Sequence, residues 1–193
     1  MDVYQLIMSR RSVRSFKPEP IPRDTLERMV DTARVAPSGA NLQPFSYLVV
    51  TEPEPRATVF DTIKWAAYIA PAGNPPQGHE PTAYVIFLID ERPGSKIYPF
   101  DAGFAAENLL ITGLAEGVGG CAILSFNPKP IVETFSLPEH LRPVMVVALG
   151  YPDEAPVMVD RSDTVKYWRD ENGLHIVPKK PLAEVMFFNR MEN

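Results

Sequence analysis

The sequence predicts an α/β sandwich, of the α+β or α/β class, in which helices cover a central sheet. Three observations support this prediction. Short apolar runs typical of strands alternate irregularly with amphipathic helical stretches, one of those runs is apolar on both faces, and no segment repeats at a fixed period. The 193 residues are 45% hydrophobic, enough for one sizeable core. We therefore expect a single domain over residues 1–193, with residues 151–193 as an extension of it.

The N-terminal part predicts two helices. Val3, Leu6 and Ile7 have the i, i+3, i+4 spacing of one face of a short helix, after which residues 13–16 extend. The closely spaced prolines of residues 17–22 make a connector, because proline removes a backbone donor and disfavours helix before it. The second helix is amphipathic and ends before Pro37. Its buried face is predicted to hold Leu26, Met29, Val30 and Ala33.

The middle of the chain predicts two strands and two more helices. Residues 47–50 and 83–89 are apolar runs, and the second of them needs cover on both faces. Residues 58–69 are predicted to be helical, and the aperiodic residues 71–81 a long loop. Residues 100–116 predict a long helix whose apolar side chains nearly encircle it, so we expect it to be buried all round, beside a partner helix or a second subunit.

The last third predicts two further strands and a tail. Residues 117–124 turn through glycines into a buried strand, and residues 144–149 form another. Beyond Gly150 the chain is rich in proline and charge and has few apolar runs, too few to fold alone. Residues 151–193 are therefore interpreted as a tail that packs on another surface, which includes the surface of a second subunit.

Composition excludes several function classes. The net charge of −5 gives no global attraction for nucleic acid or an anionic membrane, so any anion site must be local. The single cysteine, Cys121, excludes an intramolecular disulfide, and no Cys and His cluster has metal-ligand spacing. No signal peptide or membrane-spanning run is apparent, so we expect a cytoplasmic protein without a membrane or nucleic-acid partner.

Arginine is concentrated near the N-terminus. Arg10, Arg11 and Arg14, together with the Ser12 hydroxyl, lie within five residues at the junction of a helix and an extended segment. Guanidinium groups present a planar fork of donors that matches phosphate oxygens, so a phosphate ester is the natural partner. The alternative is a solvated basic patch or a set of surface ion pairs.

Two other segments could bind a ligand. Residues 37–44 (Pro-Ser-Gly-Ala-Asn-Leu-Gln-Pro) place a hydroxyl and two amides in a tight loop, although a purely structural turn uses the same residue types. In residues 117–125, glycines lead into a strand and permit a close approach of the backbone to a flat ring; the alternative is a helix C-cap followed by a buried strand. These glycines follow a helix and precede a strand, the reverse of a dinucleotide-binding fingerprint. Cys121 is interpreted as a buried, inert thiol.

In combination, these segments resemble the nitroreductase family over essentially the whole chain. The most specific matches are Arg-Arg-Ser-Val-Arg at residues 10–14 and the Pro-Ser-Gly-Ala-Asn-Leu-Gln-Pro loop. The other matches follow in the family's order at residues 101–103, 107–110, 117–121, 149–152 and 179–185. The resemblance implies a mixed, mainly antiparallel central sheet flanked by helices, and a C-terminal tail (151–193) that wraps the partner subunit of a homodimer.

The resemblance also implies a cofactor and its site. It indicates a flavin mononucleotide (FMN) at the dimer interface, reduced by NADH or NADPH and reoxidised by a small acceptor such as a nitroaromatic compound or a quinone, in a ping-pong cycle. No side chain is expected to be catalytic, because the cofactor carries the hydride chemistry. The backbone N–H of Leu124 is expected near flavin N5. By position, the residues expected to bind FMN are Arg10, Arg11, Ser12, Arg14, Pro37, Ser38, Gly39, Asn41, Gln43, Ala122, Ile123, Leu124, Ser125, Lys179 and Lys180.

Some of these expectations come with alternatives. Residues 37–43 would come from the partner subunit, and both tail positions are lysine where the family often has arginine. Trp65 and Tyr68 are candidates for a substrate wall, with core packing as the alternative for either ring. His79 is a candidate proton donor or a solvated loop histidine. For the whole chain, the alternative to an enzyme is a non-catalytic flavin-binding or flavin-storage protein.

Overall fold

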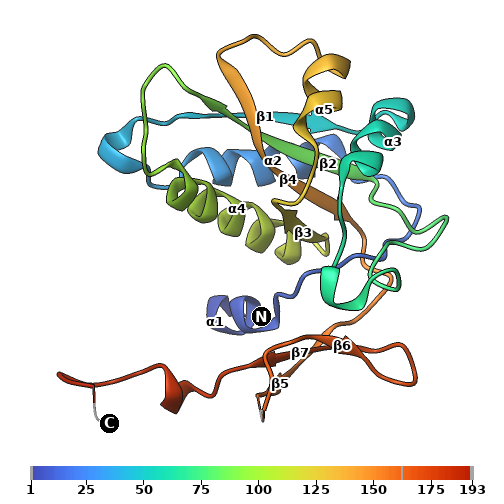
Figure 1. The fold of residues 1–193 in the computed structure, drawn as a ribbon, viewed down its shortest axis with the longest axis vertical. Coiled ribbons are helices and arrows are strands. Elements are labelled where there is room, and N and C mark those ends of the chain that lie inside the picture. The colour runs from blue at the N-terminus through green and yellow to red at the C-terminus, as the bar shows by residue number, and fades with distance from the viewer. Residues whose placement is uncertain (1, 162, 192–193) are drawn as a thin grey trace.

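The core of the protein is a four-stranded antiparallel sheet, seen in a computed structural model that describes residues 2–161 and 163–191 (Figure 1). Its strands are β1 (Phe45–Val50), β2 (Ala83–Asp90), β3 (Gly119–Ile123) and β4 (Leu141–Gly150), in the spatial order β1-β2-β4-β3. Each neighbouring pair runs antiparallel. A parallel bridge between Ser12 and Gly120 adds the N-terminal segment beside β3.

Strand β2 divides the interior into two cores, because successive side chains of a strand point to opposite faces. Val85 and Phe87 pack into one core with α2 (Arg23–Arg34) and α4 (Tyr98–Ala115). The next residues along the strand, Tyr84, Ile86 and Leu88, pack into the other core. There they meet α3 (Pro53–Thr62) and α5 (Pro128–Thr134). The predicted α+β class, with helices on both sides of a mainly antiparallel sheet, is confirmed.

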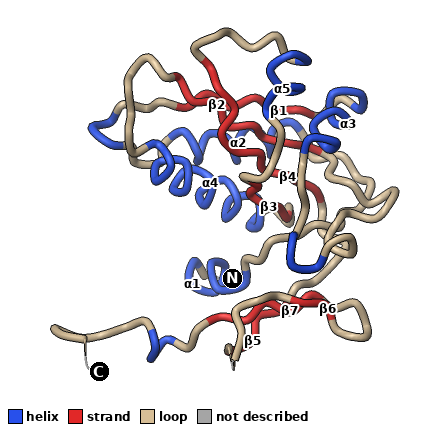
Figure 2. The backbone as a smooth tube through the Cα atoms, in the orientation of Figure 1, coloured by secondary structure: helices blue, strands red, loops and turns tan. Residues whose placement is uncertain are grey.

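The first helix, α1 (Val3–Ser9), lies outside this sandwich (Figure 2). It begins with a capping box in which the Asp2 side chain accepts the N–H of Gln5 and the Gln5 side chain accepts the N–H of Asp2. None of its residues is buried, and the apolar side chains of Val3 and Ile7 are exposed. The described part of the chain also contains the short 3₁₀ helices η1 (Gly39–Asn41), η2 (Ala67–Ile69) and η3 (Leu182–Glu184).

Residues beyond Gly150 form a small second sheet that no sequence periodicity predicts. Its strands are β5 (Val157–Asp160), β6 (Trp168–Arg169) and β7 (His175–Lys179), in the order β5-β7-β6. Strands β6 and β7 make an antiparallel hairpin, whereas β5 runs parallel to β7. After β7 the chain extends past α1 and away from the sandwich (Figure 1). Wrapping of a partner subunit by this tail stays a prediction.

The predicted helix over residues 58–69 is wrong in its bounds. Helix α3 begins at Pro53, where proline suits the first turn, and ends at Thr62. Ile63 then adopts an extended backbone and bridges Phe126, and the N–H of Lys64 donates to the carbonyl of Ser125 over 2.9 Å. Pairing with a distant segment therefore prevails over local helix propensity.

The predicted helix over residues 100–116 corresponds to α4, which is buried on one side within a single chain. Burial of its other side by a second subunit stays a prediction. One side packs into the core through Ala105, Ala106 and Leu109. The other side is open within a single chain, where the exposed fractions of Phe100 and Phe104 are 70% and 53%.

No helix within residues 2–161 and 163–191 has the length and hydropathy needed to cross a bilayer.

Substitution of Gly120 should destabilise the sheet. A Cβ at this position would lie 2.7 Å from Leu149 Cδ2 and 2.8 Å from both the Ala148 carbonyl oxygen and Leu110 Cδ2. We expect Gly120→Ala to lower the free energy of unfolding by about 1–3 kcal/mol, measured by urea denaturation. In the control variant Gly103→Ala, where no atom lies within 4 Å of the added Cβ, no loss is expected. Equal stability of both variants would contradict this close packing.

Candidate functional site

The arginine-rich segment is held between β3 and the chain that follows β4. The N–H of Val13 donates to the carbonyl of Gly120 over 3.1 Å, which extends the Ser12–Gly120 bridge. On the other side, the N–H of Asp153 donates to the Ser15 carbonyl over 2.9 Å. The arginine-rich segment is therefore fixed beside the start of the glycine-led strand.

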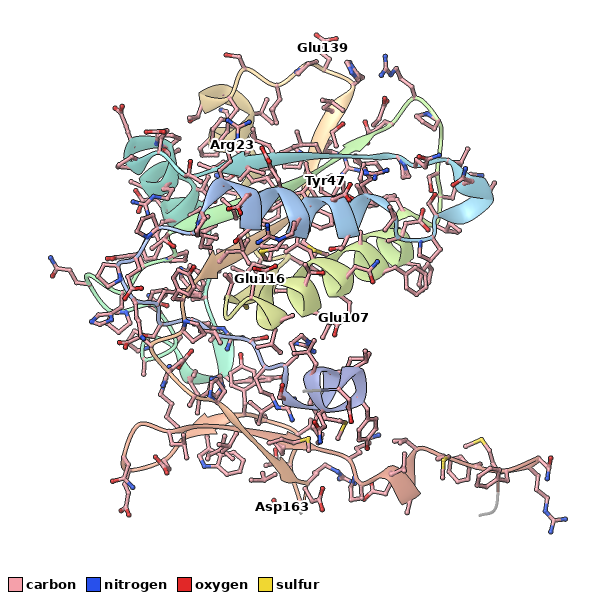
Figure 3. All side chains as sticks on the ribbon, turned by 180° about the vertical axis from the view of Figure 1, so that it is seen from behind. Arg23, Tyr47, Glu107, Glu116, Glu139 and Asp163 are labelled. Atoms are coloured by element: carbon pink, nitrogen blue, oxygen red, sulfur yellow. The ribbon has the colours of Figure 1, made fainter. Side chains whose placement is uncertain are left out.

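Arg10 and Arg11 point in different directions. The Arg10 Nε donates to Glu107 Oε1 of α4 over 2.9 Å, and Figure 3 shows Glu107 on the side of α4 that faces α1. The Arg11 guanidinium donates to the carbonyl of Arg10, and its buried Nε has no acceptor among the described residues. Burial, and then the nearby charge of Arg10, lowers the pKa of Arg11. Arg11 thus retains a buried donor that an anion would satisfy.

Arg14 lies beside Glu154, but its side chain does not pair with that carboxylate. Its backbone N–H donates to Glu154 Oε1 over 2.6 Å, and the other oxygen of Glu154 accepts from Arg169 Nη2 over 2.8 Å. No ion pair involves the Arg14 side chain within residues 2–161 and 163–191, and its Nη1 is buried without an acceptor. An unpaired guanidinium in this position is a candidate anion-binding group.

The residues predicted to lie beside a flavin ring follow directly from β3. Ile123 is buried, whereas Ala122 and Ser125 are exposed and Leu124 is 70% exposed. No backbone hydrogen bond from the N–H of Leu124 occurs among the described residues. Because Gly120 is bridged to Ser12, the same strand brings this open segment next to the arginines.

Cys121 is buried at 4% exposure, as predicted for an inert thiol. Burial raises the pKa of the Cys121 thiol, so the reactive thiolate is disfavoured near neutral pH. This cysteine therefore belongs to the packing of β3.

The Pro-Ser-Gly loop is anchored to the first turn of α4. The N–H of Gly39 donates to Asp101 Oδ1 over 3.1 Å, and the buried Asp101 carboxylate is 3% exposed. Within the loop, the Ser38 Oγ accepts the N–H of Gln43 over 3.0 Å. Asn41 and Gln43 have positive φ values of 55° and 46°, which non-glycine residues adopt rarely. Pro37 and Asn41 are exposed, so the loop is a polar element that is accessible to a ligand or a partner.

In one chain this loop lies at the start of α4, whereas Arg10 and Arg11 lie beside its second half. The loop is tied to Asp101, whereas Arg10, Arg11 and Leu114 line a common hollow near the last turns of the helix. At about 1.5 Å per residue, Asp101 and Leu114 are about 20 Å apart. Figure 2 shows η1 at one tip of the molecule, far from α1 and the small sheet. A single chain therefore does not bring the two predicted groups together.

The remaining predicted residues lie on the small sheet and on the segment after α3. Lys179 ends β7 and Lys180 follows it, and both are exposed. Trp65 is 7% exposed and its ring lies 5.7 Å from that of Phe60, so core packing applies to it. Tyr68 is 61% exposed, with its ring 5.1 Å from that of Tyr167.

Several residues at this site have no signal in the sequence. Glu154, Tyr167 and His175 come from the tail and gather around Arg14, with the Tyr167 ring centroid 5.6 Å from the Arg14 guanidinium carbon. Aromatic and acidic residues are common in any charged tail, and only the fold of the small sheet selects these three. His79, for which the sequence leaves two roles open, lies in its loop with Nδ1 2.9 Å from Asp153 Oδ2.

His175 should make the stability of the hairpin dependent on pH. It is 2% exposed, and burial, followed by the charge of Arg14, lowers its pKa below the ordinary value of about 6.5. The folded state then binds fewer protons than the unfolded state, so stability is complete above about pH 6.5 and falls as the pH decreases through that value. Urea denaturation between pH 7.5 and 5 should show this loss, and His175→Gln should show a smaller one. An identical slope in both proteins would assign the effect to other groups.

The donor set fits a phosphorylated, partly aromatic cofactor. Buried, unpaired guanidinium nitrogens of Arg11 and Arg14 lie beside β3 in a chain whose net charge is negative. The exposed backbone after β3 supplies an N–H without a partner among the described residues. No group of three or more His, Cys, Asp or Glu side chains suited to a metal ion occurs in residues 2–161 and 163–191. The site therefore supplies donors for an anion and an exposed backbone edge for a planar group.

Comparisons with known proteins agree with this description. The sequence model of the Nitroreductase family matches residues 7–151, well over half of the chain. An iodotyrosine deiodinase of Haliscomenobacter hydrossis is 27% identical over 188 residues, covering 82% of this chain and 83% of the relative. An NADH dehydrogenase of Thermus thermophilus is 25% identical over 189 residues, covering 80% and 88% respectively. A solved structure of an oxidoreductase containing FMN shares the fold, with a TM-score of 0.69 at 21% identity over 100% of this chain and 94% of that chain. The chain therefore belongs to the nitroreductase family of oxidoreductases.

Proposed function

We propose that two copies of this chain bind FMN between them and use it to pass a hydride from NADH or NADPH to a small, electron-poor acceptor such as a nitroaromatic compound or a quinone. The observation that carries the proposal is the unpaired Arg14 guanidinium in the segment that is bridged to β3. The Thermus relative is named an NADH dehydrogenase, which supports the electron donor. One solved structure with this fold is that of an oxidoreductase containing FMN, which supports the cofactor.

The chain's own residues would bind and orient the cofactor. Arg11 and Arg14 offer buried donors without acceptors, and exposed Lys179 and Lys180 add positive charge from the tail. Arg10 would contribute through whichever nitrogens its pairing with Glu107 leaves open. When bound, FMN supplies the hydride chemistry, so the protein needs no nucleophile or catalytic acid. The free N–H of Leu124 would donate to the ring, and the backbone of residues 122–125 would limit access of water to it.

A second copy of the chain would complete the site. The loop of Pro37, Ser38, Gly39, Asn41 and Gln43 lies too far from the arginines to serve the same chain's site. Within one chain, large apolar side chains on α1, α4 and the tail remain open to solvent, and such patches mark interaction surfaces. These exposed side chains are Val3, Tyr4, Ile7, Phe100, Phe104, Val185, Phe187 and Phe188. A homodimer would cover them and bring the partner's loop to the site.

The test is reconstitution of the purified protein with FMN. We expect a yellow protein that retains flavin through gel filtration and oxidises NADH or NADPH in the presence of a quinone or a nitroarene. A protein that stays colourless and inactive with excess FMN would refute the proposal. Anaerobic stopped-flow reduction separates the enzyme from a flavin-storage protein, because only the enzyme should bleach within the time of one turnover after addition of the nicotinamide nucleotide.

A further inference from the structure

The C-terminal tail contacts the N-terminal segment at Arg14. The Arg14 guanidinium carbon lies 5.6 Å from the centroid of the Tyr167 ring, within the range of a cation–π interaction. Tyr167, which directly precedes the β6–β7 hairpin, therefore meets an arginine of the N-terminal segment that lacks an anionic side-chain partner among the described residues.

The Tyr167 ring is fixed from two further sides. The ring of His175, at the start of β7, meets it edge-on at 5.4 Å and 64°. The centroid of the Tyr68 ring on η2 lies 5.1 Å from that of Tyr167, with an interplanar angle of 56°. Strand β6 also contacts η2. A ring held by two neighbours loses little further freedom when a cation stacks on it, so it is a rigid platform for Arg14.

The polar groups near this platform do not neutralise Arg14. Glu154 is occupied by the backbone N–H of Arg14 and by the side chain of Arg169. His175 is 2% exposed, and neither ring nitrogen has a hydrogen-bond partner among the described residues. The hairpin thus fixes the direction of the Arg14 guanidinium without neutralising its charge, which remains available for a ligand.

We propose that Tyr167 and His175 are positioning residues that hold the Arg14 guanidinium in the direction needed to contact the flavin, so that the β6–β7 hairpin sets both FMN affinity and flavin reduction potential through Arg14. This inference rests on the proposed function, in which Arg14 binds FMN. Tyr167 supplies the face on which the guanidinium stacks, and His175 supports that ring through their edge-on contact.

The experiment compares substitutions of two neighbouring aromatic residues, Tyr167 before β6 and Trp168 at its start. Tyr167→Leu removes the platform, and Tyr167→Phe keeps the ring. Trp168→Leu is the matched control, since Trp168 is the next residue, is 40% exposed and makes no ring contact with Arg14. The FMN dissociation constant is measured by quenching of flavin fluorescence, and the midpoint potential by dye equilibration. We expect about tenfold weaker binding for Tyr167→Leu, the size of a partly buried cation–π contact, and a change below about twofold for Tyr167→Phe and Trp168→Leu.

Two further measurements distinguish a positioning role of Tyr167 from a purely structural one: the flavin midpoint potential, and the FMN affinity of a variant that combines Tyr167→Leu with Arg14→Gln. If the positioned Arg14 guanidinium stabilises reduced FMN tenfold more than oxidised FMN, Tyr167→Leu should lower the midpoint potential by about 30 mV for a two-electron couple. In an Arg14→Gln background, Tyr167→Leu should add no further loss of affinity, because it acts through Arg14. Wild-type affinity for Tyr167→Leu, or an equal loss in the Arg14→Gln background, would overturn the inference. Absence of FMN binding by the wild-type protein would instead refute the proposed function.

Discussion

Arg14→Ala should weaken FMN binding by about 10- to 150-fold, the largest effect expected of any single substitution within one chain's site. The reason is that the Arg14 guanidinium has no ion-pair partner among the described residues, so its charge is available for the cofactor. A hydrogen bond to a charged group contributes about 1.5–3 kcal/mol, which corresponds to this change in the dissociation constant. The measurement is an FMN titration followed by flavin fluorescence.

The control for this prediction is Arg23→Ala on α2. It removes the same charge from the chain, but the Arg23 side chain is 92% exposed and pairs with Glu27 one turn along the helix. Its FMN affinity should match that of the wild-type protein. If both variants lose affinity equally, the effect comes from net charge and not from a contact of Arg14. Unchanged affinity in Arg14→Ala would show that the guanidinium does not touch the cofactor.

Phe188→Asp should convert the proposed dimer into monomers. Phe188 is 78% exposed in a single chain, so the substitution should leave the folded monomer intact. If the tail packs on the partner, each copy loses the burial of one phenylalanine, about 1.5–3 kcal/mol, and a symmetric dimer loses it twice. The dimer dissociation constant should rise by about two to four orders of magnitude. Sedimentation velocity over a range of protein concentrations measures this change.

Val132→Asp on α5 provides the comparison for the tail variant. Val132 is also a partly exposed apolar residue, at 36%, but α5 lies on the opposite side of the sandwich from the tail. Its oligomeric state should be unchanged. Dimers of the same affinity in Phe188→Asp would exclude a role for this end of the tail, and a monomeric wild-type protein would exclude the two-chain site.

The elements that the sequence predicts well are those with strong local patterns. Residues 83–89 are apolar at every position, and they form β2, which is covered on both faces. The spacing of Leu26, Met29 and Ala33 identifies the buried face of α2. The end of α3 could not be predicted in this way, because it depends on the bridge of Ile63 to Phe126, and α5 and the small sheet have no periodicity long enough to detect.

In the candidate site, too, the sequence predicts the groups with a local pattern and not those that depend on long-range contacts. The arginine-rich segment 10–14 and strand β3 have recognisable residue types. The structure places them side by side through the bridge between Ser12 and Gly120. Their partners depend on long-range contacts that no local pattern encodes. Glu107 pairs with Arg10 across 97 positions of the chain, and Glu154 and Tyr167 reach Arg14 from still farther along it. The sequence therefore indicates which groups could bind a phosphate, and the fold decides which of them remain unpaired.

The number of residues between His175 and Lys179 in strand β7 decides whether their side chains share a face. His175 begins the strand and Lys179 ends it, an even separation that puts both side chains on one face, about 13 Å apart. One inserted residue between them would make the separation odd and turn one of the two to the opposite face. The hairpin that supports Arg14 and the ammonium groups proposed for the phosphate could then no longer serve the same ligand. We therefore expect an insertion within these five residues to impair cofactor binding more than an insertion in the turn before β7.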